Sequence, residues 1–108
     1  MSAQDKYHEL VKAALQKDGW TITHDPLKLK VGKRKLKIDL GAERVLAAEK
    51  GEEKIAIEIK SFLGPSLLTD FYHALGQYSV YRLTLAKVDE TRTLFLARAI
   101  ASAFQNIH

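Results

Sequence analysis

Glu58 and Lys60 are the residues whose types and spacing best suit catalysis, and they end an apolar segment, residues 54–60. In a β-strand, residues i and i+2 point to the same face, so this carboxylate and this ammonium group would lie side by side. The isoleucines between them would point to the other face. Carboxylate oxygens bind hard divalent cations, and a positive charge beside a phosphodiester assists its hydrolysis. The segment therefore indicates a nuclease.

Asp39 supplies a second carboxylate upstream of this segment. A hairpin turn at residues 51–52 predicts antiparallel pairing that places Glu43 roughly opposite Lys60. Asp39 would then lie just beyond the paired region, at the same end of the hairpin. Gly41 offers the bulge or bend that would swing Asp39 inward. Asp39 is the better metal ligand on this reasoning, and Glu43 is a credible substitute that the sequence does not separate from it.

The Glu-x-Lys spacing is weak by itself, because Glu52, Glu53 and Lys54 repeat it in a stretch that reads as a polar turn. The alternative interpretation of Glu58 and Lys60 is an exposed ion pair, which contributes little to stability. Only their position at the end of an apolar strand favours catalysis over that alternative.

A helix is expected to follow, from Ser66 as its N-cap to about residue 86. Helical spacing predicts that one of its faces packs on the core: Leu68, Phe71, Tyr72, Leu75 and Ser79. The opposite face carries hydrogen-bonding groups of short or rigid reach: Asp70, His73, Gln77 and Tyr81. A merely solvated face usually carries Lys, Glu and Arg, so this stripe favours a site or a partner, although any helix has a polar face.

Residues 27–38 form a basic segment without a single acidic residue. Apolar and basic residues alternate on both sides of a turn at residues 32–34, which predicts a hairpin with one apolar and one basic face. The basic residues are Lys28, Lys30, Lys33, Arg34, Lys35 and Lys37. Lysines also guard exposed strand edges, so a solvated edge hairpin is the alternative to a surface that contacts phosphates. The absence of any balancing acid favours nucleic acid.

The remaining elements are predicted from periodicity and turn residues. Residues 4–18 form an amphipathic helix with Tyr7, Leu10, Val11, Ala14 and Leu15 on its core stripe, and Gly19 ends it. Strands are expected at residues 20–23, 43–49, 54–60 and 93–97, with a turn at 24–26 and a loop at 89–92. A short helix completes the chain, and residues 1–108 read as one domain.

Composition excludes several classes of protein. The chain has 108 residues, a net charge of +4 and no cysteine, so thiolate catalysis, disulfides and cysteine-bound zinc are excluded. The mild basic excess permits a polyanionic partner. No apolar segment is long enough to span a membrane and the N-terminus shows no signal region, so a cytoplasmic protein is the expectation.

Together these residues resemble a known family. Asp39, the Glu58–Lys60 triplet and Gln77 followed by Tyr81 are similar to the motif of the PD-(D/E)XK nuclease superfamily, including its Gln-x-x-x-Tyr subset. Longer runs resemble the XisH proteins, the fdxN-element excision controlling factors: DGWTITHDP (18–26), IDLGAER (38–44), AIEIKSF (56–62), GPS (64–66) and HALGQY (73–78). The resemblance covers about residues 5–85.

The resemblance implies an α/β (α+β) fold with a central mixed sheet flanked by helices, in the restriction-endonuclease-like order αβββαβ. It implies that Asp39 and Glu58 hold Mg²⁺ or Mn²⁺ together with the backbone carbonyl of Ile59. Lys60 would orient or activate the attacking water, and Gln77 would support the site from the helix with Tyr81 as its companion. It also implies DNA as substrate, a role in DNA excision or recombination, and a second small protein, XisI, as partner.

The sequence departs from the family pattern in two respects. Many superfamily members carry a glutamate on the first helix, whereas Glu9 here lies opposite the core stripe and His8 flanks it. Relatives also extend beyond the position of His108, so apolar residues near the end are expected at a dimer interface: Phe95, Leu96, Ile100 and Phe104. A metal-dependent endonuclease, a catalytically silent DNA-binding accessory factor and a subunit that binds an XisI-like partner are the three functions under consideration.

Overall fold

The computed structural model of the chain describes residues 3–46, 51–61 and 66–99. Its helices and strands follow one another in this order: α1 (Ala3–Lys17), β1 (Thr21–His24), β2 (Leu27–Val31), β3 (Arg34–Ile38), β4 (Leu40–Leu46), β5 (Gly51–Ser61), α2 (Leu67–Val88) and β6 (Arg92–Ala99). The predicted αβββαβ order is confirmed once the β2–β3 hairpin is set apart, because it forms a two-stranded sheet of its own.

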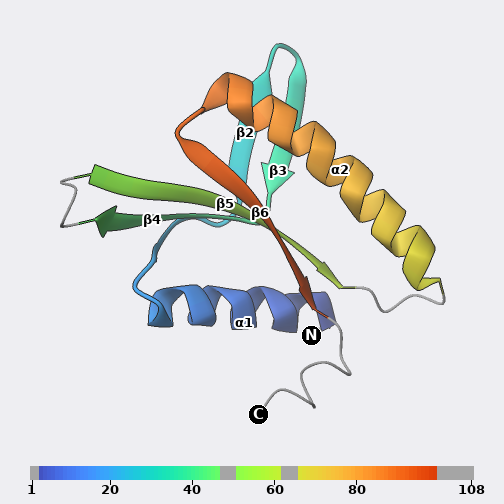
Figure 1. Cartoon of the computed structure of the whole chain (residues 1–108), viewed down its shortest axis with the longest axis horizontal. Coiled ribbons are helices and arrows are strands. Elements are labelled where there is room, and N and C mark those ends of the chain that lie inside the picture. The colour runs from blue at the N-terminus through green and yellow to red at the C-terminus, as the bar shows by residue number, and fades with distance from the viewer. Residues whose placement is uncertain (1–2, 47–50, 62–65, 100–108) are drawn as a thin grey trace.

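The main sheet has the strand order β1-β4-β5-β6. Strands β1, β4 and β5 pair antiparallel, whereas β6 runs parallel to β5 after the chain has crossed over through α2. Helix α1 lies along one face of the sheet and α2 lies on the other, as Figure 1 shows. The mixed sheet between helices is the α+β architecture expected from the sequence.

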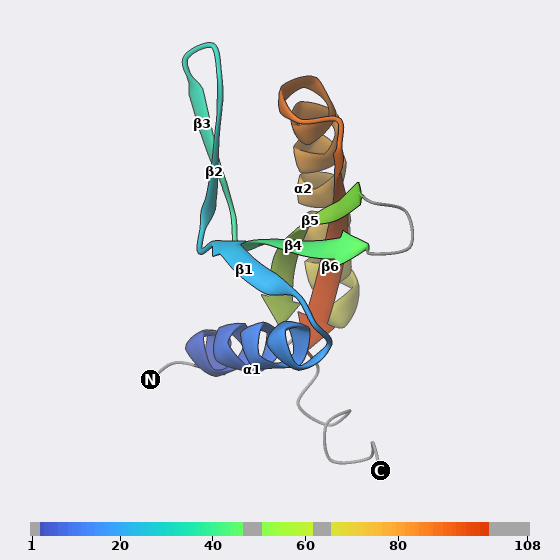
Figure 2. The same cartoon turned by 90° about the vertical axis from the view of Figure 1, so that its left-hand side faces the viewer.

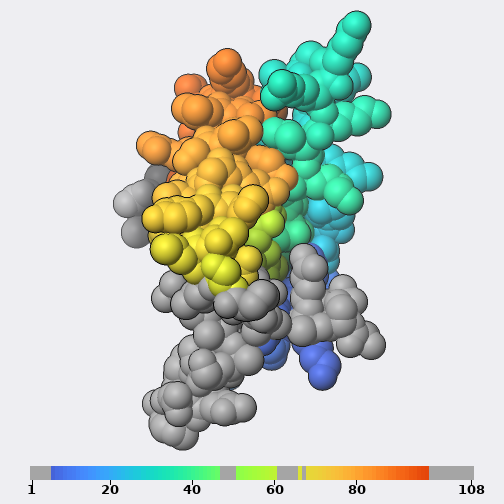
Figure 3. Space-filling model, turned by 90° about the vertical axis from the view of Figure 1, so that its right-hand side faces the viewer, coloured from blue at the N-terminus to red at the C-terminus, as the bar shows by residue number. Residues whose placement is uncertain are grey.

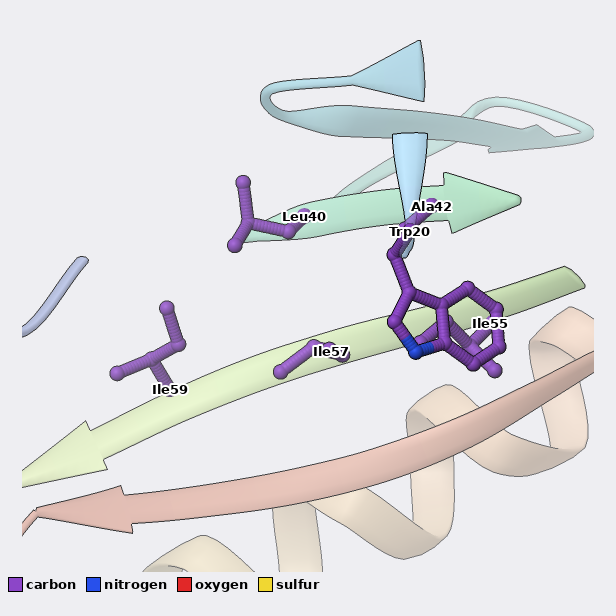
Figure 4. Close-up of a cluster of buried hydrophobic side chains, with 6 residues drawn as sticks. All are labelled: Trp20, Leu40, Ala42, Ile55, Ile57 and Ile59. Carbon is purple, nitrogen blue, oxygen red and sulfur yellow. The ribbon is translucent and has the colours of Figure 1, made fainter. Parts of the chain in front are cut away.

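Strand β5 divides the core into two clusters because its side chains alternate between the faces of the sheet. On the α1 side, the buried cluster of Figure 4 consists of Trp20, Leu40, Ala42, Ile55, Ile57 and Ile59, and Tyr7, Val11 and Leu15 of α1 pack against it. On the α2 side, the buried cluster consists of Leu27, Leu29, Ile38, Ala56, Leu85 and Leu94. Glu58 and Lys60 therefore face α2 and the hairpin, whereas the isoleucines face α1.

Helix α1 confirms the predicted bounds within one residue, and Gly19 ends it with a φ of 91°. The core stripe is narrower than predicted. Tyr7, Val11 and Leu15 pack on the sheet, but Leu10 is 54% exposed and Ala14 is also exposed. The helix touches the sheet along a single line at i, i+4 spacing, so apolar residues beside that line remain in solvent.

The pairing of β4 with β5 differs from the predicted register. Leu40 lies opposite Ile57, Glu43 lies opposite Lys54, and Leu46 lies opposite Gly51. The predicted turn at residues 51–52 and the predicted pairing of Glu43 with Lys60 are therefore wrong. The polar stretch 51–54 is strand because it pairs with opposite charge: Arg44 Nη2 lies 2.6 Å from Glu53 Oε1, and Lys54 Nζ lies 3.6 Å from Glu43 Oε1.

The sequence suggested that Gly41 bends the chain toward Asp39, and this prediction is wrong. The irregularity lies in β1, between Ile22 and His24, and His24 pairs with Gly41. A Cβ at Gly41 would lie 3.1 Å from the Cβ of His24 and 3.3 Å from Nη1 of Arg92. The glycine therefore permits the close approach of β1 and the Arg92 side chain over this position.

Helix α2 begins as predicted, with Ser66 as the N-cap whose hydroxyl accepts a hydrogen bond of 3.3 Å from the Thr69 N–H. The predicted core face is wrong. Leu68, Tyr72 and Leu75 are 62%, 61% and 47% exposed, and Phe71 and Ser79 are exposed as well. The residues turned toward the sheet are Ala74, Gln77, Tyr78, Tyr81 and Leu85. The surface beneath α2 carries Glu58 and Lys60 as well as Ala56 and Leu94, so tyrosines and a glutamine pack there beside Leu85.

Strand β6 includes the predicted residues 93–97 and begins at Arg92, which was expected in the loop. The short final helix was predicted from about residue 98. Residues 98–99 belong to β6, and the rest of that prediction lies outside the described residues. Neither of the helices that the structure describes is both long and apolar enough to cross a membrane.

Candidate active site

Asp39 is the single residue between β3, which ends at Ile38, and β4, which begins at Leu40. The pairing of Leu40 with Ile57, continued by one residue, brings Asp39 opposite Glu58. The Asp39 N–H donates a hydrogen bond of 3.3 Å to Oε1 of Glu58, and the Ile59 N–H donates one of 2.7 Å to Oδ2 of Asp39. Both carboxylates therefore lie at one place, where the hairpin meets the main sheet.

Lys60 lies beside Glu58, as the i, i+2 spacing predicted. Its Nζ is 3.8 Å from Oε2 of Glu58. The Glu58 side chain is 5% exposed and that of Lys60 is 31% exposed, so the carboxylate is buried while the ammonium group reaches solvent. A substrate that approached from solvent would meet the ammonium group next to the buried Glu58 carboxylate.

The position of Glu58 next to Asp39 changes the protonation of Glu58. Burial, a hydrogen bond with Asp39 and the negative charge of Asp39 raise the pKa of Glu58 to about 8, and the opposing effect of the Lys60 charge is smaller. At neutral pH and without a cation, Glu58 therefore holds a proton. A divalent cation that bound both groups would have to displace that proton, because metal ligands bind in their deprotonated form.

The residues at this place fit a magnesium ion. Asp39 and Glu58 offer hard carboxylate oxygens, and Mg²⁺ is commonly held by one or two carboxylates while water and substrate phosphates complete its octahedral shell. No group of three or more His, Cys, Asp or Glu side chains that could hold a metal occurs in residues 3–46, 51–61 and 66–99. The donor set is therefore typical of Mg²⁺ or Mn²⁺ and not of a closed structural site.

Two of the four residues in the predicted polar stripe of α2, Gln77 and Tyr81, are half-buried on the side of the helix that faces the sheet. The Gln77 side-chain amide donates a hydrogen bond of 3.0 Å to the hydroxyl of Tyr81. Burial raises the pKa of Tyr81, and the nearby charges of Glu58 and Asp39 raise it further. Tyr81 thus lies within the electrostatic reach of both carboxyl groups. His73 is exposed, and Asp70 lies in the first turn of α2.

The structure also separates the two candidate partners of Glu58. Glu43 lies opposite Lys54, with its carboxylate 3.6 Å from Lys54 Nζ and 3.9 Å from Arg92 Nη2. It belongs to a charged cluster further along the sheet, so Asp39 is the carboxylate beside Glu58. The sequence missed the Ile59 N–H as the group that fixes Asp39. Only the correct strand register could have revealed it.

The first-helix residues stay away from the carboxylates. Glu9 is exposed, as predicted. His8 Nε2 lies 2.7 Å from Oδ1 of Asp25, and Lys12 Nζ lies 2.8 Å from Oδ2 of the same residue. These contacts join α1 to the turn before β2. His8 therefore has a structural partner.

The predicted basic hairpin is confirmed as β2 and β3, with Gly32 at a φ of 60° in its turn. Its six basic side chains are all exposed: Lys28, Lys30, Lys33, Arg34, Lys35 and Lys37. Of the residues predicted at a dimer interface, Phe95 is 51% exposed and Leu96 is half-buried, whereas Ile100 and Phe104 lie outside the described residues.

Comparison with known proteins gives one family. The family model described as "XisH protein" matches residues 1–107. The structure is similar to the crystal structure of an XisH family protein from Nostoc punctiforme, with 44% identity and a TM-score of 0.74 over 92% of this chain and 72% of that one. It is also similar to an fdxN element excision controlling factor protein from Anabaena variabilis, with 45% identity and a TM-score of 0.76 over 94% and 74% of the two chains. No curated protein is significantly similar.

Proposed function

Since the chain belongs to the XisH family, we propose that it is a metal-dependent endonuclease-like component of DNA element excision that hydrolyses phosphodiester bonds in DNA. The observation that carries the proposal is the meeting of Asp39 and Glu58, with Lys60 Nζ 3.8 Å from Glu58. The name of the Anabaena variabilis relative, an excision controlling factor, supports the biological setting. The same residues would make the protein a member of the PD-(D/E)XK superfamily.

Bound Mg²⁺ or Mn²⁺ would supply Lewis acidity toward a phosphoryl oxygen and an acidified water. Asp39 and Glu58 would hold the cation with the Ile59 carbonyl, and the hydrogen bond from the Ile59 N–H keeps Asp39 oriented for that role. Lys60 would orient the attacking water and offset charge that develops on the phosphate. Tyr81, which accepts a hydrogen bond from Gln77, would border the site on the α2 side.

A second candidate is a DNA-binding accessory factor without catalysis. The specific observation in its favour is that only two carboxylates meet in the described part of the chain, because Glu9 lies in solvent on α1. Such a protein would bind DNA through the hairpin and would be indifferent to the loss of Asp39 or Glu58.

A third candidate is a subunit whose main ligand is an XisI-like protein or a second copy of the chain. The outward face of α2 supports it, because Leu68, Tyr72, Leu75 and Leu83 are between 47% and 68% exposed there. Large exposed apolar patches mark interaction surfaces. Co-purification with the partner, and the absence of DNA affinity, would favour this function.

Calorimetric titration of Mn²⁺ tests the metal site directly. Wild type is expected to bind Mn²⁺, Asp39→Asn is expected not to, and Asp18→Asn, an exposed carboxylate elsewhere, should bind as wild type does. Nicking of supercoiled DNA in Mg²⁺ or Mn²⁺ then tests catalysis, with Lys60→Ala expected to be inactive while still folded. Equal inactivity of wild type and Lys60→Ala across metals and substrates would refute the catalytic function.

A further inference from the structure

The β2–β3 hairpin carries charge in an arrangement that costs stability. Lys28 lies directly opposite Lys37, and Lys30 lies directly opposite Lys35. Like charges in directly opposed cross-strand positions destabilise a sheet. Across the residues that the structure describes, none of the hairpin's basic side chains forms an ion pair with a carboxylate. A hairpin that only needed protected edges would not require opposed lysine pairs on one face.

The other face of the hairpin explains why these lysines point outward. Leu27, Leu29 and Ile38 are buried in the cluster that includes Leu85 of α2. The hairpin is thus fixed to the body by its apolar face near its base, and it extends away from the main sheet, as Figures 1 and 2 show. Side chains two residues apart on a strand are roughly 6.5–7 Å apart, so the two lysine pairs form a short ladder of positive charge.

Along the chain, the lysine ladder ends close to the two carboxylates: Lys37 precedes Asp39 by two residues. Strand β3 ends at Ile38 and Asp39 follows at once, hydrogen-bonded to β5. In Figure 3, the surface of β5 is seen between α2 (yellow to orange) and the hairpin (cyan to green). Strand β3 of the hairpin therefore leads directly to Asp39, which lies beside Glu58.

We propose that the β2–β3 hairpin is an arm that binds the phosphate backbone of double-stranded DNA through its opposed lysine pairs. A two-stranded β-ribbon fits the major groove of B-form DNA. Phosphates along the borders of the groove would offset the repulsion between the opposed lysines of the free protein. An anionic membrane fits less well, because the lysine face of the two strands carries no apolar residue; Val31, 36% exposed, lies on the other face with Leu27 and Leu29. The proposal rests on the proposed function for the choice of DNA over other polyanions.

Binding is measured without hydrolysis, by fluorescence anisotropy of a labelled duplex in EDTA between about 50 and 200 mM salt. The hairpin variant removes one opposed pair, Lys28→Gln with Lys37→Gln. The control variant, Lys6→Gln with Lys17→Gln, removes two exposed lysines from α1, which lies on the opposite face of the sheet. We expect the Kd of the hairpin variant to be about tenfold higher than that of wild type. The slope of log Kd against log salt should fall by about 1.8, since each of the two lost phosphate contacts contributes about 0.9. The control should match wild type.

A single charge reversal separates a loss of binding from a loss of folding. Lys37→Glu places a carboxylate opposite Lys28, so it replaces a repulsive pair with an attractive one. We expect its Tm to equal or exceed that of wild type while its affinity for the duplex falls further than in the glutamine variant. Lower affinity together with a lower Tm would overturn the proposal, because the lysine would then act through folding.

The remaining outcomes distinguish this proposal from the proposed function. Equal affinity and salt slope in wild type and the hairpin variant would overturn it, even if both nick DNA. Binding of wild type to anionic vesicles or to an acidic polypeptide but not to the duplex would also overturn it. Loss of duplex binding in the hairpin variant, in a protein that never nicks DNA, would uphold the arm and refute the nuclease.

Discussion

The backbone N–H of Ile59 donates a hydrogen bond of 2.7 Å to the carboxylate of Asp39, so the residue that joins the hairpin to the main sheet is fixed by the strand that carries Glu58. The reverse contact, from the Asp39 N–H to Oε1 of Glu58, completes a reciprocal pair. A residue at a bend between two sheets would otherwise have considerable freedom. The reciprocal contacts hold the two carboxyl-bearing residues side by side without a cation.

This relationship predicts different effects for two substitutions of Asp39. Asp39→Ala leaves the Ile59 N–H without its acceptor and should lower the free energy of unfolding by about 1–3 kcal/mol. Asp39→Asn retains an acceptor oxygen and should cost less stability, yet both variants should lose Mn²⁺ binding. Urea denaturation and calorimetry check the two effects separately. Equal stability of the alanine and asparagine variants would contradict the structural role of the Ile59 contact.

Glu58 predicts a pH-dependent stability in the metal-free protein. Its pKa is about 8 in the folded state and near 4.5 when unfolded, so its stabilising effect is complete below about pH 4.5 and is lost as pH rises through 8. Glu58→Gln cannot ionise and should gain stability relative to wild type across that interval, with a plateau above it. A gain of 1 kcal/mol would raise Tm by roughly 4–8 °C in a domain of this size. Thermal unfolding in EDTA at several pH values measures the difference in Tm between Glu58→Gln and wild type. A difference that does not vary with pH would refute the prediction.

Tyr81 should matter to the site more than to the fold. Tyr81→Phe removes the hydroxyl that accepts the hydrogen bond from Gln77 and should reduce metal-dependent nicking by up to about 100-fold, because a small displacement of groups that position a reaction can cost that much. Tyr72→Phe is the matched control, because Tyr72 lies on the same helix and is 61% exposed. Circular dichroism verifies folding in both. Equal activity of the two variants would place Tyr81 outside the site.

The orientation of α2 can be tested with neighbouring residues. Ala74 is 3% exposed, so Ala74→Leu should overpack the contact with the sheet and cost about 1–3 kcal/mol. Leu75 is 47% exposed, so Leu75→Lys should change the stability of a monomer by less than about 0.5 kcal/mol. Sedimentation velocity on both variants shows whether the outward face of α2 also mediates self-association. If Leu75→Lys destabilised the protein more than Ala74→Leu did, the helix face predicted from the sequence would be the one that packs on the core.

The sequence by itself determined the features that depend on neighbours along the chain. The bounds of α1, the Ser66 cap and the alternation of the basic hairpin follow from capping chemistry and from periods of 3.6 and 2 residues. The same alternation placed Glu58 and Lys60 together on one face of β5. Each of these features is set within a few residues, which is the range over which sequence patterns are informative.

Only the tertiary structure decided which elements meet, and in what register. The choice of Asp39 over Glu43 depends on the pairing of β4 with β5, where a polar stretch became strand because its charges find opposite charges across the sheet. The core face of α2 was inverted for a similar reason: the sheet beneath it carries the Glu58 carboxylate, and Gln77 and Tyr81 suit that surface better than leucines do. Burial of a side chain depends on what lies opposite it in space, and that partner is distant in the sequence.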